Sequence, residues 1–211
     1  MLEIKDVSCV RGDRPLFSGL HFTVAPGTIC RVLGPNGTGK TSLLRMISGL
    51  SPPADGEILW NGQSIYRLRE EFFAHLFYFG HAPALKDELT AEENLHIAAT
   101  LAGMDVAPAE VRAALARMGL RGREDLPARV LSAGQRRRVT LARMVLPGAP
   151  ALWVLDEPFS ALDVAAVDQL REIIENHVAQ GGMAVFTTHQ DAPWTVPVNS
   201  VSLEKRKHVR C

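Results

Sequence analysis

A glycine-rich segment near the N-terminus has the residue types and spacing of a phosphate-binding loop. Residues 34–41 read GPNGTGKT, which fits GxxxxGK(S/T), and they stand between an apolar run and a helix-like stretch. Glycines allow a positive φ and bring backbone N–H groups against phosphate oxygens, and the N-terminus of a following helix adds partial positive charge. We therefore expect Lys40 to reach the β- and γ-phosphates of a nucleotide and the Thr41 hydroxyl to bind Mg²⁺. The predicted nucleotide contacts from this segment are Gly34, Pro35, Asn36, Gly37, Thr38, Gly39, Lys40, Thr41 and Ser42.

Two acidic residues follow the apolar run Ala151–Leu155, at the end of a predicted buried strand. An ionised carboxylate at this place costs several kcal/mol unless a cation or hydrogen-bond donors meet it. Mg²⁺ held between Thr41, the phosphates and Asp156 would supply that cation. Glu157 is then placed to orient and deprotonate the attacking water, an effect worth roughly 10²–10⁴ in rate for a general base. Taken singly, the two patterns have simpler explanations, namely a chance glycine-rich turn and a strand end with exposed acids. Their occurrence together disfavours both.

Strands and helices alternate around these segments, which favours an α/β fold with a mostly parallel sheet, the core of the P-loop NTPases. Thr90 and Glu93 have the spacing of a capping box, so a helix is expected to begin there. From about Thr90 to Val145 the sequence is helical in character, which indicates an inserted α-helical subdomain. The other expected elements are strands at Leu2–Val7, Ile29–Leu33, Glu57–Trp60, Ala151–Leu155 and Met183–Thr187, and helices at Thr41–Ile47 and Asp163–Ala179.

Composition excludes several classes of protein. The 211 residues hold 23 Lys plus Arg against 23 Asp plus Glu, so no whole-molecule field favours nucleic acid or an anionic membrane. Cys9, Cys30 and Cys211 show no CxxC spacing, which indicates two small core residues and a tail thiol in a reducing compartment. The N-terminus lacks the apolar stretch of a signal peptide, and the most apolar region, residues 144–155, is far shorter than the ~20 residues of a membrane helix. We therefore expect a chain that does not itself cross a bilayer.

Three further segments resemble motifs of the ABC transporter ATPases. Residues 131–135, LSAGQ, are similar to the LSGGQ signature, residues 160–163, SALD, resemble the D-loop, and His189 resembles the switch histidine. The resemblance spans Leu2 to about His189 and implies the ABC ATPase fold with an antiparallel β N-terminal part. It also implies a head-to-tail dimer with a second copy of the chain, in which each signature closes over the γ-phosphate held by the other copy. The implied catalytic residues are Glu157, His189 and Lys40, and the implied contacts to the partner's ATP are Ser132, Ala133, Gly134, Gln135 and Asp163.

Two positions depart from the pattern of that family. Where the family often has an aromatic residue that stacks on adenine, this chain carries Arg11. Its guanidinium plane could stack on the base instead, and weak binding of adenine is the alternative. At the position of the Q-loop glutamine stands His81, a further candidate for a direct or water-mediated contact to Mg²⁺.

Four stretches resemble the ATP-binding subunits of bacterial cytochrome c maturation, the CcmA type; they are residues 80–95, 131–139, 180–183 and 187–190. This resemblance implies a peripheral protein on the cytoplasmic face of the bacterial inner membrane. It would be paired with integral membrane subunits of a haem-handling complex, so its contact with the membrane would be indirect. An ABC ATPase for another substrate, a non-transport ABC protein and a nucleotide-binding module without turnover are the alternatives. Glu157 opposes the last, and the small helical block between Lys40 and Ser132 disfavours a nucleic-acid-associated protein.

The resemblance also divides the chain, taken as a single ABC ATPase domain of residues 1–211. Residues 1–85 and 150–205 are expected to form the catalytic core with its β-subdomain, 86–149 the helical signature subdomain, and 205–211 a basic tail. The tail is interpreted as a solvated end, with weak attraction to anionic lipid as the alternative. The run Arg136–Arg138 is interpreted as a solvated helix face, with a contact to the neighbouring subunit as the alternative.

Overall fold

Residues 1–82, 84–188 and 193–204 are described in the computed structural model of the chain, which divides into two units. The core unit comprises Met1–Tyr78, Ala151–Pro158 and His177–Cys211. The helical unit comprises Phe79–Pro150 and Phe159–Asn176. It therefore includes a segment beyond residue 150, whereas the expected helical subdomain covers residues 86–149 only.

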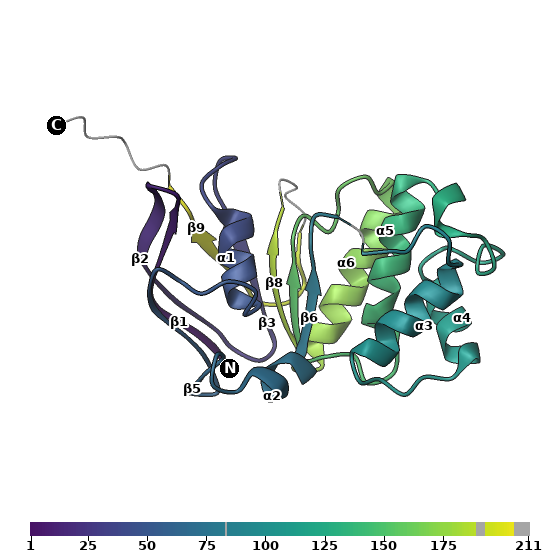
Figure 1. The fold of residues 1–211 in the computed structure, drawn as a ribbon, viewed down its shortest axis with the longest axis horizontal. Coiled ribbons are helices and arrows are strands. Elements are labelled where there is room, and N and C mark those ends of the chain that lie inside the picture. The colour runs from purple at the N-terminus through teal and green to yellow at the C-terminus, as the bar shows by residue number, and fades with distance from the viewer. Residues whose placement is uncertain (83, 189–192, 205–211) are drawn as a thin grey trace. The chain divides into compact units, whose positions relative to one another are not determined.

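An antiparallel sheet of order β2-β1-β4-β5 forms the N-terminal part of the core unit (Figure 1). Its strands are β1 (Leu2–Arg11), β2 (Arg14–Val24), β4 (Asp55–Trp60) and β5 (Gln63–Ser64). Leu2, Ile4 and Val7 of β1 are fully buried between more exposed neighbours, as in a strand with one face on the core. The sequence predicts β1 and β4 but misses β2, because register shifts along its pairing with β1 interrupt the apolar alternation.

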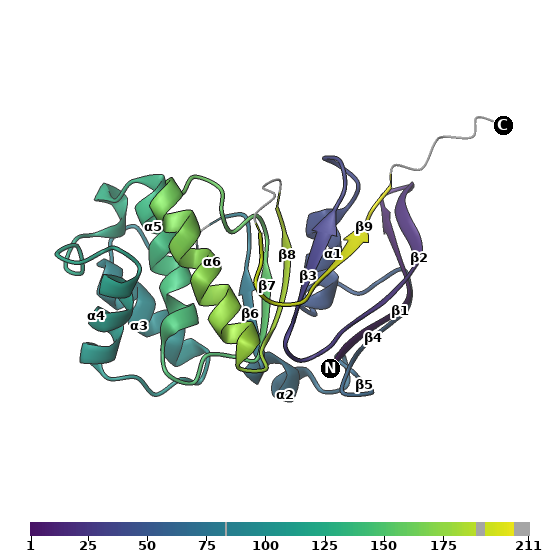
Figure 2. The same ribbon diagram turned by 180° about the vertical axis from the view of Figure 1, so that it is seen from behind.

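A second sheet of the core unit, of order β6-β7-β8-β3-β9, carries the predicted phosphate loop (Figure 2). Its strands are β3 (Thr28–Leu33), β6 (Leu76–Phe79), β7 (Leu152–Leu155), β8 (Met183–Thr187) and β9 (Val198–Ser202). β3 pairs in parallel with β8 and β9, and β7 pairs in parallel with β8. β7 and β8 are buried along their whole length, which explains their unbroken apolar runs. The carboxyl ends of β3, β7 and β8 thus meet at one edge, where sheets of this kind bind ligands.

Of the residues described, the core unit contains the helices α1 (Lys40–Ile47) and α2 (Arg69–Ala74). α1 follows β3 and packs against β7 and β8. Cys9 and Cys30 are buried in this unit, and burial raises the pKa of the Cys30 thiol to about 12. Both residues are therefore core residues, as the sequence predicts, whereas Cys211 lies outside the described residues.

The helical unit contains α3 (Ala91–Leu101), α4 (Pro108–Arg117), η1 (Ala128–Val130), α5 (Ala133–Leu141), η2 (Ala142–Val145) and most of α6 (Val164–Ala179). The predicted capping box begins α3: Thr90 Oγ1 accepts from the Glu93 N–H at 3.1 Å, and Glu93 Oε2 accepts from the Thr90 N–H at 2.8 Å. The buried Asn94 amide donates to the carbonyls of Lys86, Leu89 and Thr90, and so fixes the loop that leads into this helix.

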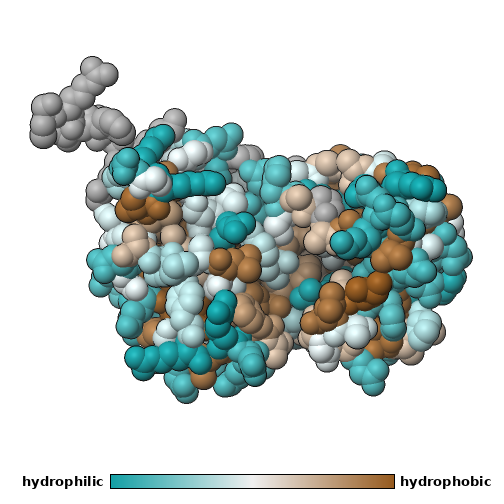
Figure 3. All heavy atoms as spheres, viewed as in Figure 1, coloured by the Kyte–Doolittle hydropathy of each residue, from teal (hydrophilic) through white to brown (hydrophobic). Residues whose placement is uncertain are grey.

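The predicted fold class, an α/β core with a mostly parallel sheet, an antiparallel N-terminal sheet and a helical insertion, is confirmed. Among the described residues, no helix has the length and apolar character that crossing a membrane requires. Hydrophilic and hydrophobic side chains are mixed on the face shown in Figure 3. The most exposed of the large apolar side chains described are Leu101, Val164 and Val130, at 84%, 80% and 60%.

Candidate active site

The loop between β3 and α1 has the backbone shape expected of a phosphate cradle. Gly34, Gly37 and Gly39 have φ angles of 144°, 80° and 103°, a range that residues with a Cβ rarely adopt. A Cβ at Gly34 would lie 2.4 Å from the carbonyl oxygen of Leu203, so a close backbone approach also requires glycine there. Gly39 is the N-cap of α1 and adds no side-chain cap, which leaves the first backbone N–H groups of the helix for an anionic ligand.

Lys40 opens α1 and is only 8% exposed. Its Nζ donates to the carbonyl oxygen of Gly34 at 2.7 Å and lies 3.4 Å from both the Pro35 carbonyl oxygen and Asn36 Oδ1. The Thr38 hydroxyl donates to the same Pro35 carbonyl at 2.9 Å and holds the turn together. The loop therefore wraps around the ammonium group, so a phosphate held in it would meet a full positive charge as well as backbone donors.

Asp156 follows β7 and is 3% exposed. Thr41 Oγ1 donates to its Oδ2 at 2.8 Å, and Thr187 Oγ1 donates to its Oδ1 at 2.8 Å. Each carboxylate oxygen thus has a donor, which offsets part of the cost of burying the charge. Burial, and after it the negative charge of Asp156, raises the pKa of the Tyr78 phenol against the opposing effect of Arg45. The phenol therefore stays protonated beside this carboxylate.

Glu157 has a backbone conformation that is rare for its residue type. Its φ is +49°, which for a residue other than glycine costs roughly 1–3 kcal/mol. The Glu157 N–H donates to Thr187 Oγ1 at 2.9 Å, and the same hydroxyl donates to Asp156. One threonine therefore links the two acids and holds Glu157 in its strained conformation, with its side chain half-buried.

Thr187 is the functional residue that sequence reasoning missed, because the pattern shows it only as the end of a strand before His189. It is fully buried at the carboxyl end of β8, and β8 pairs with the strand that leads into Asp156. A hydroxyl in an otherwise apolar buried strand, next to a strand that ends in two acids, was the available signal.

The donors present suit Mg²⁺. The Thr41 hydroxyl and the Asp156 carboxylate are oxygen ligands held 2.8 Å apart at the helix end of the cradle. No cluster of three or more His, Cys, Asp or Glu residues with metal-ligand geometry occurs in the described parts of the chain. The Thr41–Asp156 pair fits Mg²⁺, which proteins usually bind through one or two side chains together with substrate phosphates and water.

The predicted signature residues lie at the N-terminus of α5, in the helical unit. Ser132 is the N-cap: its Oγ accepts from the Gln135 N–H at 3.3 Å, and its own N–H donates to Gln135 Oε1 at 2.9 Å. Ala133 is the first helical residue, and both it and Ser132 are exposed. A Cβ at Gly134 would lie 2.8 Å from the carbonyl oxygen of Ala161, so this glycine allows α5 to pack on residues 160–163. The arrangement is that of an anion-binding helix end.

Asp163, predicted to contact the partner's ATP, has contacts within its own unit. Its Oδ1 accepts from the Ala166 N–H at 2.9 Å and so caps α6, and its Oδ2 pairs with Arg138 of α5. The Ala166 N–H and then the positive charge of Arg138 lower the pKa of the Asp163 carboxyl. Asp163 therefore links the signature helix to the start of α6, and its contact to ATP stays a prediction.

The prediction of a solvated face for Arg136–Arg138 is wrong. Arg137 is 6% exposed, and its guanidinium carbon lies 4.7 Å from the centroid of the Phe79 ring. Arg136 pairs with Asp87 at 2.6 Å, and Arg138 pairs with Asp163. Consecutive residues of a helix point about 100° apart, so three arginines in a row cannot share one solvent-facing side.

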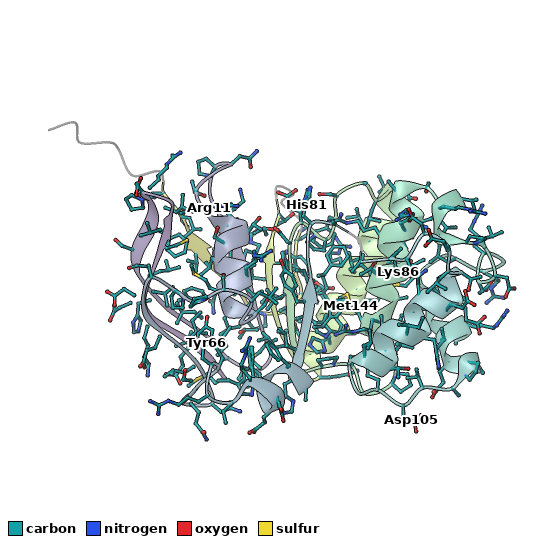
Figure 4. All side chains as sticks on the ribbon, viewed as in Figure 1. Arg11, Tyr66, His81, Lys86, Asp105 and Met144 are labelled. Carbon is teal, nitrogen blue, oxygen red and sulfur yellow. The ribbon has the colours of Figure 1, made fainter. Side chains whose placement is uncertain are left out.

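The remaining predicted features are Arg11, His81, His189 and the basic tail. Arg11 is exposed at the end of β1, and the β1–β2 hairpin tip lies on the side of the core unit that carries the loop before α1 (Figure 4). His81 is exposed and belongs to the helical unit. His189 and the basic tail, residues 205–211, lie outside the described residues. The contacts of Arg11 and His81 to nucleotide or metal stay predictions.

Comparison with known proteins adds three similarities. Residues 17–160 match the family model of ABC transporters. The chain is 54% identical over 205 residues to the cytochrome c biogenesis ATP-binding export protein CcmA of Aromatoleum aromaticum, covering 97% of this chain and 96% of that protein. It is 52% identical over 191 residues to the protein of the same name in Nitrosomonas europaea, covering 90% and 89%.

Solved structures show the same fold. A protein of Pyrococcus furiosus described as an ABC transporter ATP-binding protein superposes with a TM-score of 0.82 at 28% identity, covering 96% of each chain. A dimeric bacterial ABC transporter cassette gives a TM-score of 0.83 at 20% identity, covering 98% of this chain and 97% of that one.

Proposed function

Because the chain belongs to the ABC transporter family and, within it, to the CcmA-type ATP-binding export proteins, we propose that it hydrolyses ATP for an export complex of cytochrome c biogenesis. The observation that carries the hydrolytic role is the hydrogen-bonded set of Thr41, Asp156, Thr187 and Glu157 beside the glycine cradle. In this set Thr41 and Asp156, the proposed Mg²⁺ ligands, lie with Glu157, the proposed general base, at the carboxyl edge of one sheet.

The chemistry follows from the placement of these residues. ATP lies with its β- and γ-phosphates in the loop of residues 34–41, against Lys40 and the N-terminus of α1. Thr41 and Asp156 would hold Mg²⁺, which would supply positive charge to offset the charge of the phosphates. Glu157 takes a proton from water as the water oxygen bonds to the γ-phosphorus, and the bond between that phosphorus and the β–γ bridging oxygen breaks. ADP and inorganic phosphate leave. The Thr187 hydrogen bond supports this role, because it fixes the backbone that carries the base.

The active species is a head-to-tail dimer of two copies of the chain. In it the N-terminus of α5, with Ser132 through Gln135, meets the γ-phosphate in the cradle of the other copy, and Asp163 lies nearby. ATP binding closes this dimer and hydrolysis reopens it.

Membrane subunits convert this cycle into transport. We infer that the chain is peripheral on the cytoplasmic face of the bacterial inner membrane and drives integral membrane subunits of a haem-handling complex. The CcmA-type relatives, which carry the words "cytochrome c biogenesis" and "export" in their names, support this assignment.

Glu157→Gln tests the hydrolytic role. The amide keeps the size of the side chain but cannot accept the proton, so we expect turnover to fall by roughly 10²-fold or more while ATP binding persists. ATP-dependent dimers should then accumulate and be visible by size-exclusion chromatography with light scattering. Glu57→Gln, an exposed acid on β4, is the matched control and should hydrolyse ATP like the wild type. Normal turnover by Glu157→Gln would refute the assignment of the general base.

Affinity purification of the chain from membranes, followed by identification of the copurifying proteins, tests the transport assignment. Recovery of membrane subunits of cytochrome c maturation is the expected result. Recovery of the membrane subunits of an unrelated transporter, or of ribosomes, would contradict it.

A further inference from the structure

Arg137 is a buried cation that the proposed hydrolysis does not use. It lies in α5, is 6% exposed, and its guanidinium carbon stands 4.7 Å from the centroid of the Phe79 ring. Phe79, the last residue of β6, is itself only 1% exposed. Both residues belong to the helical unit, so this contact is internal to that unit.

Burying a positive charge costs free energy, and groups that attract the charge offset part of that cost. The face of an aromatic ring attracts a cation, and the attraction strengthens when water is excluded, as it is between these two buried side chains. The planar guanidinium can also lie along the ring, which a lysine ammonium cannot do. The pair therefore fixes the position of α5 against Phe79 more narrowly than an aliphatic contact would.

The contact lies close to the signature. In a helix, residues three and four apart share a face, so Arg137 projects from the side of α5 that also carries Ala133 and Gly134. Gly134 packs against the Ala161 carbonyl, and Arg138 pairs with Asp163. The N-terminal half of α5 is thus held by three contacts inside the helical unit, to Phe79, to Ala161 and to Asp163.

We propose that Arg137 is a positioning residue for ATP hydrolysis. Its stacking on Phe79 holds the N-terminus of α5 in the orientation in which Ser132 and the adjacent backbone N–H groups reach the γ-phosphate bound to the second copy. The cradle that binds ATP first belongs to the core unit and does not depend on Arg137. This inference rests on the proposed function and adds to it the residue that sets the geometry of the signature helix.

Arg137→Met tests the proposal, because methionine fills a similar apolar volume without the cation. In the Glu157→Gln background we expect ATP-dependent dimerisation to weaken roughly 10- to 30-fold, the loss expected from one desolvated cation–π contact. In the otherwise wild-type chain, kcat should fall by a similar factor. The Kd of a fluorescent ATP analogue for the monomer should stay within about twofold of the wild-type value, because the cradle that binds the analogue belongs to the core unit.

Three further variants distinguish positioning from simple packing. Phe79→Leu keeps an apolar side chain and removes the ring face, so it should weaken dimerisation in the same direction as Arg137→Met, and the double variant should be no worse than Arg137→Met alone. Arg137→Lys should restore part of the dimerisation, because a cation again faces the ring. Arg121→Gln, which removes an exposed arginine of the same unit, is the matched control and should change nothing.

Wild-type dimerisation and kcat in Phe79→Leu and Arg137→Met, with only a lower Tm, would overturn the proposal and leave Arg137 a packing residue. If Arg137→Met does not fold, Phe79→Leu and Arg137→Lys decide the question by the same two measurements. Failure of this inference is distinguishable from failure of the proposed function, because the latter is decided by the turnover of the wild type and of Glu157→Gln.

Discussion

Thr187→Val removes the hydroxyl that joins the two acids of the site and keeps the branched shape of the side chain. The hydroxyl makes two short hydrogen bonds, donating to Asp156 Oδ1 at 2.8 Å and accepting from the Glu157 N–H at 2.9 Å. Thr187 is fully buried, so water cannot take its place without rearrangement of β8. The substitution therefore leaves a buried charge and a buried N–H each with one partner fewer.

The size of the effect follows from those two bonds. A hydrogen bond to a charged group contributes about 1.5–3 kcal/mol and one between neutral groups about 0.5–1.5 kcal/mol, so the free energy of unfolding should fall by about 2–4.5 kcal/mol. In a chain of this size each kcal/mol lowers Tm by roughly 2–4 °C, which gives an expected decrease of roughly 4–18 °C. Because Glu157 would lose the bond that holds its strained backbone, kcat should fall even at temperatures where the variant is folded.

Urea unfolding, calorimetry and steady-state ATPase assays measure these changes. Thr187→Ser keeps the hydroxyl and should recover most of the stability and activity lost in Thr187→Val. Thr23→Val, at an exposed position of β2, is the matched control and should leave both quantities near the wild-type values. An unfolding free energy for Thr187→Val within about 0.5 kcal/mol of the wild type, the range of a neutral surface change, would refute the reasoning.

Two other predictions concern the cradle and the response to pH. Gly34→Ala places a Cβ 2.4 Å from the Leu203 carbonyl oxygen, so nucleotide affinity by fluorescence titration should fall at least ~10-fold, whereas Gly62→Ala, a positive-φ glycine in open space, should bind normally. The His177 ring stacks on Trp153 with 3.6 Å between the ring centroids, and burial lowers the pKa of His177 from its ordinary 6.5. As pH falls below 6.5, the unfolded chain binds a proton more readily than the folded chain does, so the free energy of unfolding decreases. His177→Phe keeps the stack and should lose less stability than the wild type between pH 7.5 and 5.5 in urea titrations; an equal loss in both would contradict this role.

Features that depend on neighbouring residues could be predicted from the sequence. The predicted capping box of Thr90 with Glu93 joins residues three positions apart, and it begins a helix in the structure. The glycines of residues 34–39 adopt the positive φ angles that the loop pattern requires. The apolar runs that became β7 and β8 are buried throughout, because a strand covered on both faces needs no polar side.

The sequence by itself thus determined the fold class, the cradle and the order of the motifs, since their backbone conformations are set by local residue types. Only the tertiary structure decided the partners: Asp156 meets Thr41, 115 positions away, as well as Thr187, and Arg137 stacks on Phe79 instead of facing solvent. The physical reason is that the energy of a buried hydroxyl or cation depends on which elements pack around it. That neighbourhood arises from long-range strand pairing and helix packing, which no short pattern along the chain encodes.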